Sequence, residues 1–399
     1  MMANILCVYE NVIATVSITE KFFQELSNYD NRVAVRYVPV KKLEKQDISW
    51  CDVLYMIRPN NGCFARIAKL AHQYGVTVAL FLDDDLMNLP KVHADIPWRK
   101  RGLANAVRNS DIIVSPNPII CNKYGKEFNV LRTVIQDTAV PSSNIKNHVD
   151  NENQKIKIVY SAGVAHKILF NKYIKPILGE LDKRLGDKIS LTFVGVHPDV
   201  NPSEYKMPVT FISPMPFDAY RKRMEQENFD IGLAPLDSND FTKCKYFNKF
   251  LEYAMFGVVG LYSDTEPYTF VVNHKINGIL VGNKPENWLD AICEAVKNVQ
   301  LIQDCREASY DTLKTRFDSK TIMNIILQDI PELTREHKNK QVEINTLFFI
   351  KLRYFISRFG DWGYKSLFYF KTGGLREVFK GIKRRINTIR IEKRGNSRA

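Results

Sequence analysis

Short hydrophobic runs recur along the first half of the chain and alternate with segments of helical spacing. The runs lie at residues 5–9, 33–40, 52–57, 76–82, 111–115 and 130–135. Their length predicts buried β-strands. Between them, apolar side chains recur three and four positions apart, as at Phe22, Phe23 and Leu26, which predicts amphipathic helices. Strands that alternate with helices predict a parallel sheet covered on both faces.

The second half repeats this alternation after a polar stretch at 141–155. Further hydrophobic runs lie at 156–162, 191–195, 209–213, 230–236, 258–263 and 278–282. Helical spacing fits residues 168–186, 217–228, 246–256 and 285–299. The polar stretch has the composition of a linker. We therefore predict an α/β protein of two facing Rossmann-like domains, residues 1–145 and 156–330, with ligands at the carboxyl ends of the strands.

The composition is that of a globular protein, with 45% apolar and 25% charged residues. No apolar run reaches the ~18–20 residues of a spanning helix, and the first residues lack the basic region of a secretory signal. The seven cysteines are scattered without a C-x-x-C pair. We expect them to be small buried side chains in a reducing cytoplasm, with no zinc site and no disulfide framework.

The net charge of +13 is concentrated at the carboxyl end. Residues 337–399 hold 16 Lys or Arg against 4 Asp or Glu, which is +12 and leaves +1 for residues 1–336. Nucleic-acid binding is disfavoured because the body is nearly neutral and carries no basic groove studded with aromatic residues.

Candidate chemistry is densest in residues 230–263. The pattern predicts a strand ending at Leu236, a polar loop, and a helix starting near Tyr246. The predicted core face of this helix contains Phe247, Phe250, Leu251 and Ala254. A second predicted face contains Lys245, Asn248, Lys249 and Glu252.

Three lysines crowd the start of this helix, where the helix dipole disfavours cations: Lys243, Lys245 and Lys249. A bound diphosphate would relieve that conflict and would also accept hydrogen bonds from the helix N–H groups. Glu252, one to two turns further on, could accept hydrogen bonds from two neighbouring sugar hydroxyls. The alternative is a solvated basic face on which Glu252 pairs with Lys249.

The same segment resembles the donor-binding region of two-Rossmann-domain, group 1 or GT-B type, glycosyltransferases, especially bacterial surface-polysaccharide members. The matching residues are Ala234-Pro235-Leu236, Lys245, Lys249 to Ala254, Gly257, Pro267-Tyr268, Asn277 to Val281 and Trp288. The resemblance implies that Glu252 binds the donor ribose and that the lysines meet the diphosphate. Asn248, on the same predicted face, is a further donor-binding candidate. It covers roughly residues 80–300.

Two more segments match the same family. The turn from Ser161 to His166 resembles its G-S-x-x-H turn, which implies that Gly163 and His166 contact the donor phosphate or sugar. The alternative for His166 is an exposed loop side chain. The segment 81–90 resembles its D-D-D-L segment, and Asp83, Asp84 and Asp85 repel one another if all are charged. They are candidates for holding an acceptor hydroxyl or for acting as a base. The competing interpretation is a metal site at Asp83 and Asp85, which the donor signature disfavours.

The chain departs from many retaining relatives in one respect, since Cys244 replaces a glutamate eight positions before Glu252. We predict a glycosyltransferase, hexosyltransferase-like, that moves a sugar from a nucleotide-diphosphate donor to a glycan or lipid-linked acceptor in surface polysaccharide biosynthesis. We expect no cofactor and no obligatory metal. The alternative, favoured by Cys244 and by the altered order of small residues in the Gly163 loop, is a non-catalytic sugar-nucleotide or glycan-binding subunit that kept the fold.

The tail, residues 337–399, has a different pattern. Residues 346–370 are dense in aromatics, and Leu375, Phe379, Ile382, Ile386 and Ile389 form one apolar stripe. Basic amphipathic helices rich in aromatics lie in membrane interfaces. We therefore predict a cytoplasmic protein attached to an anionic membrane surface at the inner face of the cell membrane. The alternative is that the stripe packs on the body.

Overall fold

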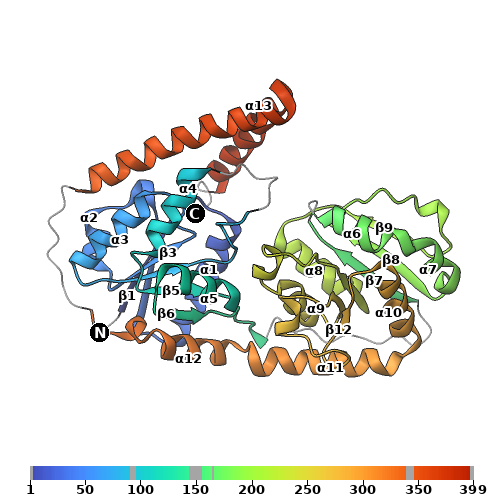
Figure 1. Cartoon of the computed structure of the whole chain (residues 1–399). Coiled ribbons are helices and arrows are strands. Elements are labelled where there is room, and N and C mark those ends of the chain that lie inside the picture. Colours follow the sequence, from blue (N-terminus) through green and yellow to red (C-terminus); the bar gives the residue numbers. More distant parts are fainter. Residues whose placement is uncertain (1–2, 90–95, 143–154, 164–165, 338–345, 396–399) are drawn as a thin grey trace. The chain divides into compact units, whose positions relative to one another are not determined.

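The computed structural model describes residues 3–89, 96–142, 155–163, 166–337 and 346–395. Within these residues, the twelve predicted strands form two parallel sheets. At 217–218, 346, 372–373 and 376–395 the backbone alone is described. The chain divides into two compact units, residues 1–114, 121–134 and 330–399, and residues 115–120 and 135–329. Each unit holds one sheet (Figure 1).

The sheet of the first unit has the order β2-β1-β3-β4-β5-β6. Its strands are β1 (Ala3–Tyr9), β2 (Val33–Pro39), β3 (Val53–Ile57), β4 (Thr77–Phe81), β5 (Ile112–Ser115) and β6 (Arg132–Ile135). Its helices are α1 (Ala14–Tyr29), α2 (Lys45–Trp50), α3 (Cys63–Gln73), α4 (Pro97–Val107) and α5 (Pro118–Phe128). The central strands β1, β3, β4 and β5 are buried along nearly their whole length, as expected of a sheet covered on both faces. The edge strands β2 and β6 are partly exposed. The strand order reverses between β1 and β3, so their carboxyl ends form a topological switch point.

The sheet of the second unit has the order β12-β11-β10-β7-β8-β9. Its strands are β7 (Ile156–Ser161), β8 (Ile189–Val194), β9 (Val209–Ile212), β10 (Ile231–Ala234), β11 (Val259–Ser263) and β12 (Ile279–Val281). Its helices are α6 (Lys167–Tyr173), α7 (Leu178–Leu185), α8 (Phe217–Glu227), α9 (Asn248–Met255), α10 (Pro285–Lys297), α11 (Val299–Arg316) and α12 (Ser319–Asp329). The switch point lies between β7 and β10, which pair in parallel.

Two hydrophobic cores cover the two faces of this second sheet. Ile158 and Tyr160 of β7 belong to one core, and Val159 between them belongs to the other. This alternation follows from the two-residue period of a strand. The sheet is thereby held rigidly on both faces, with its strand ends left to carry polar loops.

The predicted helix at 168–186 is wrong as a single element. Helix α6 ends at Tyr173, a 3-10 turn spans Lys175–Ile177, and α7 begins at Leu178. Pro176 explains the break, because it lacks the N–H that a continuous helix needs and its ring crowds the preceding turn. Helices α11 and α12 were not predicted at all.

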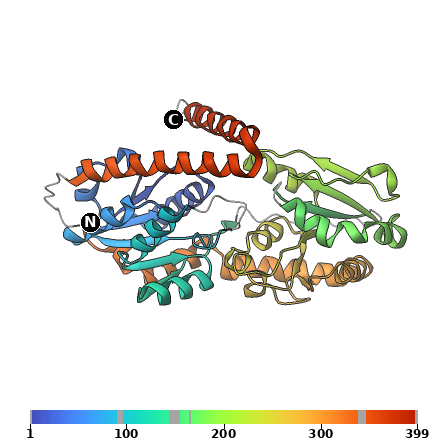
Figure 2. The same ribbon diagram turned by 45° about the horizontal axis from the view of Figure 1, so that its top comes forward.

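The tail forms one element, α13 (Thr346–Gly395), which belongs to the first unit and contacts α3 there. Both views show this helix bending back on itself (Figures 1 and 2). Gly374 has a φ of 66° within it, a left-handed conformation that glycine adopts at low cost. The predicted stripe from Phe379 to Ile389 lies outside the described side chains. No helix in the described part of the chain is both long and apolar enough to span a bilayer.

All seven cysteines lie in described positions and are buried. The expectation that they are buried thiols is confirmed. Residues 115–120 and 135–142 belong to the second unit, and α13 belongs to the first.

Candidate functional site

The loop before α9 carries the first two candidate lysines. Helix α9 begins at Asn248 and not near Tyr246, so Lys243 and Lys245 precede the helix and share no helical face with Lys249. Lys245 has an extended backbone, with φ −74° and ψ 162°. Phe247 occupies the N-cap position and is buried. The predicted core face of α9 is confirmed, since Phe247, Phe250, Leu251 and Ala254 are all at most 3% exposed.

Lys249 and Glu252 form a partly buried polar network with two residues that sequence analysis did not identify as site residues. Lys249 Nζ lies 2.8 Å from Glu252 Oε2, with the two side chains 26% and 17% exposed. Tyr220 of α8 donates a short hydrogen bond to Glu252 Oε1. Ser161, at the end of β7, has its Oγ 2.9 Å from the Tyr220 hydroxyl and accepts from Lys249 Nζ at 3.3 Å. The pairing considered as an alternative is therefore present, but on a sheltered face and not a solvated one.

His166 lies at the start of α6 in the same electrostatic environment. Burial lowers its pKa, and the positive charges of Lys245 and Lys249 lower it further. The imidazole is therefore neutral at neutral pH. His166 N donates to Gly163 O at 2.9 Å, and Gly163 is exposed with open space where a Cβ would stand. Residues 164–165 of the turn lie outside the described residues.

Two segments from the first half of the sequence hold the lysine loop in place. Asn117, 1% exposed, donates from Nδ2 to the carbonyls of Lys243 and Lys245 at 2.9 and 2.7 Å. Tyr246 donates to Asp137 Oδ1 at 2.9 Å. Burial raises the pKa of Asp137 despite this hydrogen bond. These contacts hold the backbone of Lys243, Lys245 and Tyr246 in a loop conformation. Helix α9 therefore begins later than its sequence pattern predicts.

The carboxylates of Asp83 and Asp84 follow β4 in the first unit and share one cation. Arg58 lies 3.3 Å from Asp83 Oδ1 and 3.4 Å from Asp84 Oδ2. Thr15 donates to Asp83 Oδ2 at 2.6 Å. Arg58 has a φ of 48°, and such a conformation costs a non-glycine residue about 1–2 kcal/mol. Residue type alone does not reveal this strained arginine at the switch point of the first sheet.

Asp85 has a different environment from its two neighbours. Its side chain is fully buried and accepts hydrogen bonds from Lys123 Nζ at 2.6 Å and Tyr124 at 2.8 Å. Asn88 and the backbone of Met87 donate to it as well. Burial alone would raise the pKa of Asp85, but the hydrogen bonds outweigh it and hold the pKa below its ordinary value. These contacts indicate that Asp85 anchors the loop.

The three aspartates therefore do not act as one repelling group. Asp83 and Asp85, the pair considered for a metal, are engaged by different partners. Among the residues with described side chains, no cluster of three or more His, Cys, Asp or Glu is arranged to hold a metal ion.

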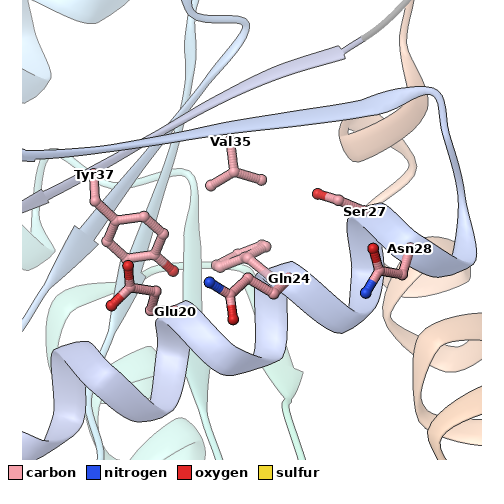
Figure 3. Close-up of a pocket in the computed structure, with 7 residues that line it drawn as sticks. Glu20, Gln24, Ser27, Asn28, Val35 and Tyr37 are labelled. Atoms are coloured by element: carbon pink, nitrogen blue, oxygen red, sulfur yellow. The ribbon is translucent and has the colours of Figure 1, made fainter. Parts of the chain in front are cut away.

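A separate hollow lies on the first unit between α1 and β2 (Figure 3). It is lined by Glu20, Phe23, Gln24, Ser27, Asn28, Val35 and Tyr37. No lysine or arginine is among these lining residues, so the hollow lacks the cations that a diphosphate requires. Lysine side chains lie instead beside the switch point of the second sheet, where Lys249 contacts Glu252 and Ser161.

No family model matches the sequence, and no curated protein matches it. Solved structures do match the fold. HepE of Anabaena in complex with UDP-glucose gives a TM-score of 0.57 at 11% identity, over 82% of this chain and 99% of that one. The lipopolysaccharide outer core galactosyltransferase WaaB gives 0.57 at 10% identity, over 82% and 99%. Sucrose-phosphate synthase from Thermosynechococcus elongatus gives 0.59 at 10% identity, over 83% and 99%. The chain thus has the two-Rossmann-domain GT-B fold, as predicted.

Proposed function

We propose that the protein is a glycosyltransferase that moves a sugar from a nucleoside-diphosphate donor to an acceptor hydroxyl. The observation that carries the proposal is the convergence of Lys245, Lys249 and His166 beside Glu252 at the switch point of the second sheet. Cations suit a diphosphate, and a carboxylate suits vicinal sugar hydroxyls. That HepE binds UDP-glucose on the same fold supports this assignment.

In the proposed reaction, the bond between the anomeric carbon and the diphosphate oxygen breaks, and a bond from that carbon to the acceptor oxygen forms. Lys243, Lys245 and Lys249 stabilise the negative charge on the leaving diphosphate, together with the N–H groups at the start of α9. Glu252 holds the ribose, and His166, neutral before the donor binds, donates to the donor phosphate or sugar. No metal is required, since lysines supply the countercharge.

The acceptor hydroxyl loses its proton to a carboxylate, which we assign to Asp83 or Asp84. Both stand at the carboxyl end of β4, where a parallel sheet binds ligands, and both have exposed area. Asp85 positions this loop through its buried contacts and does not meet the acceptor. Asn248, exposed in the first turn of α9, and Gly163 would contact the donor at its edges.

We further propose that the donor sugar is a hexose and that the acceptor is a glycan or lipid-linked glycan of surface polysaccharide biosynthesis. The protein would then act at the inner face of the cell membrane, where such acceptors are built. The basic tail and the resemblance to surface-polysaccharide enzymes support this finer assignment.

A non-catalytic sugar-nucleotide-binding subunit is the second candidate. Cys244 is 1% exposed, so the position at which many retaining relatives carry a glutamate offers no polar group to a donor sugar. Such a subunit would bind the nucleotide sugar without breaking it.

One experiment separates these candidates. The full-length protein is incubated with UDP-, GDP-, CDP- and dTDP-hexoses, and both thermal stabilisation and release of nucleoside diphosphate are measured. We expect one donor class to raise the melting temperature, since a ligand at about 100 times its dissociation constant adds about 2.7 kcal/mol, and to be hydrolysed slowly. Stabilisation without any hydrolysis, with acceptor extracts present, would favour the binding subunit. No stabilisation by any donor would refute both.

A further inference from the structure

The first half of α13 is fixed to the first unit by a buried charge network. Asp361, 5% exposed, accepts a hydrogen bond from Trp98 Nε1 at 2.8 Å and pairs with Arg99 of α4. Arg99 also pairs with Glu10, directly after β1. Arg358 of α13 reaches the same Glu10 at 3.1 Å. The helix is thus docked at the carboxyl end of β1, next to the switch point of the first sheet.

The docked side of α13 accounts for only part of its apolar surface. Ile350 and Tyr354 are 2% and 4% exposed and face the first unit. Nine other apolar side chains are between 44% and 74% exposed: Phe348, Phe349, Leu352, Phe355, Ile356, Phe359, Trp362, Leu367 and Phe370. At about 100° per residue they fall within an arc of about 140°, opposite the docked side.

The area of this outer face exceeds what a monomeric protein normally leaves in water. Aromatic side chains bury about 150–250 Å² each, so the six aromatics of this face, more than half exposed on average, present about 700 Å² before the three aliphatic side chains are added. Typical largest apolar patches on soluble monomers are about 300–600 Å². The face therefore needs an occupant.

The charges around the outer face indicate which occupant. Residues 346–375 contain five cations, Lys351, Arg353, Arg358, Lys365 and Lys371, and one acid, Asp361. That acid is buried in the docking network, so no carboxylate stands on the described outer face. A second copy of the chain would bring the same basic borders together across a two-fold axis, which is unfavourable. An anionic lipid surface complements both the apolar arc and its borders.

We propose that the outer face of α13, residues 348–370, inserts into the headgroup–acyl boundary of an anionic membrane while the helix stays docked on Glu10 and Arg99. The docking then holds the carboxyl edge of the first sheet, with Asp83 and Asp84, at a fixed distance from the lipid surface. Resting on the proposed function, this arrangement favours acceptors that are themselves membrane lipids carrying a glycan.

The test compares two matched double variants of the full-length chain. Phe355→Ser with Phe359→Ser removes two aromatics of the outer face. Leu131→Ser with Ile276→Ser removes two side chains that are 91% and 60% exposed elsewhere. Sedimentation with vesicles of phosphatidylcholine containing about 30% phosphatidylglycerol measures binding. We expect at least a tenfold weaker partition coefficient for the first variant and no change for the second, with donor hydrolysis unaltered in both. Equal partition of the two variants overturns the proposal.

Trp362 supplies an independent readout, because it is 55% exposed on the outer face. Its fluorescence should shift to shorter wavelength on these vesicles, and Trp362→Phe should abolish the shift while sedimenting normally. If instead the wild type is a dimer that the Phe355/Phe359 variant dissociates, and neither binds vesicles, a second copy is the occupant and the proposal is wrong. Vesicle binding as expected with no donor turnover by any variant would refute the proposed function alone.

The lipid-linked acceptor has its own variant. Asp361→Asn weakens the docking network but leaves the outer face unchanged. We expect this variant to bind vesicles like the wild type. The ratio of its transfer rate to a lipid-linked acceptor over its transfer rate to a soluble acceptor analogue should be several-fold lower than that of the wild type. An unchanged ratio would show that docking does not position the acceptor.

Discussion

Glu252 is the residue whose proposed role can be separated most cleanly from the roles of its neighbours. In the structure its carboxylate is shared by Lys249 and Tyr220. In the proposed complex the diphosphate takes Lys249, and the carboxylate accepts from two ribose hydroxyls instead. Glu252→Gln keeps the size of the side chain and one carbonyl acceptor but removes the charge. The substitution therefore tests the charge of the carboxylate and leaves the packing of α9 intact.

The expected magnitude follows from the two hydrogen bonds. A bond to a charged acceptor contributes about 1.5–3 kcal/mol and a neutral one about 0.5–1.5 kcal/mol, so losing the charge costs roughly 1 kcal/mol per bond. Two bonds give about 2 kcal/mol, which is about a 30-fold rise in the dissociation constant of the nucleoside diphosphate. Inorganic pyrophosphate has no ribose. Its affinity should stay the same or rise a few-fold, because Lys249 loses the carboxylate that partly neutralises it.

Isothermal titration of the purified variant with nucleoside diphosphate and with pyrophosphate measures both effects. Lys249→Met should weaken both ligands, and Glu294→Gln, which breaks the exposed 2.5 Å pair with Lys275 elsewhere in the same unit, should weaken neither. The reasoning is refuted if Glu252→Gln weakens the two ligands equally, since the carboxylate would then support the lysine and not the ribose. It is also refuted if neither affinity changes.

Four further outcomes are expected. Asp83→Asn and Asp84→Asn should each lower transfer to acceptor at least tenfold while leaving nucleotide affinity within twofold. The wild type should keep full activity in excess EDTA, and a loss of activity that manganese restores would contradict catalysis without a metal. Asp85→Asn should lower the free energy of unfolding by about 2 kcal/mol. Because hydrogen bonds lower the pKa of Asp85 in the folded protein, this difference should be present above about pH 4 and should vanish as the pH falls through the folded-state pKa. Urea denaturation of both proteins over a series of acidic pH values would measure it. A bound nucleotide sugar should raise the lowered pKa of His166, so its affinity should increase from about pH 8 to about pH 6, and His166→Ala should flatten that dependence. Asn117→Ala should raise the KM for the donor several-fold through the lysine loop, with kcat at saturating donor little changed; an unchanged KM would refute the role of Asn117.

The strand pattern was readable from the sequence because the central strands of both sheets are buried on both faces. A strand such as β10, with every residue buried, must be apolar throughout and bounded by polar loops, and that pattern is visible without any tertiary information. The lysines before and in α9 were proposed as a donor site because cations at a helix start conflict with the helix dipole. A local electrostatic conflict of this kind is visible in a single sequence.

The partners that arrange the site were invisible for the opposite reason. Asn117 holds carbonyls that lie 126 and 128 positions away, and an asparagine in a loop carries no sign of such contacts. Tyr220 sits on a polar helix, and the strained backbone of Arg58 leaves no trace in residue type. The tail illustrates both cases. Its amphipathic character was predicted, but the buried Asp361 that docks it could not be distinguished from any exposed acid.

The residues of the proposed donor site already satisfy part of their own charge, and this explains how the lysines around the start of α9 are tolerated. Lys249 is held by Glu252 and Ser161, and Lys245 Nζ lies 5.0 Å from the centre of the Phe241 ring, where a cation–π interaction stabilises it. In the proposed complex, the diphosphate would compete for Lys249 and so free one oxygen of Glu252 for the ribose. Binding of the phosphate half of the donor and of the nucleoside half should therefore be cooperative. The affinity of a nucleoside alone should increase when pyrophosphate is already bound, and Glu252→Gln should abolish that coupling.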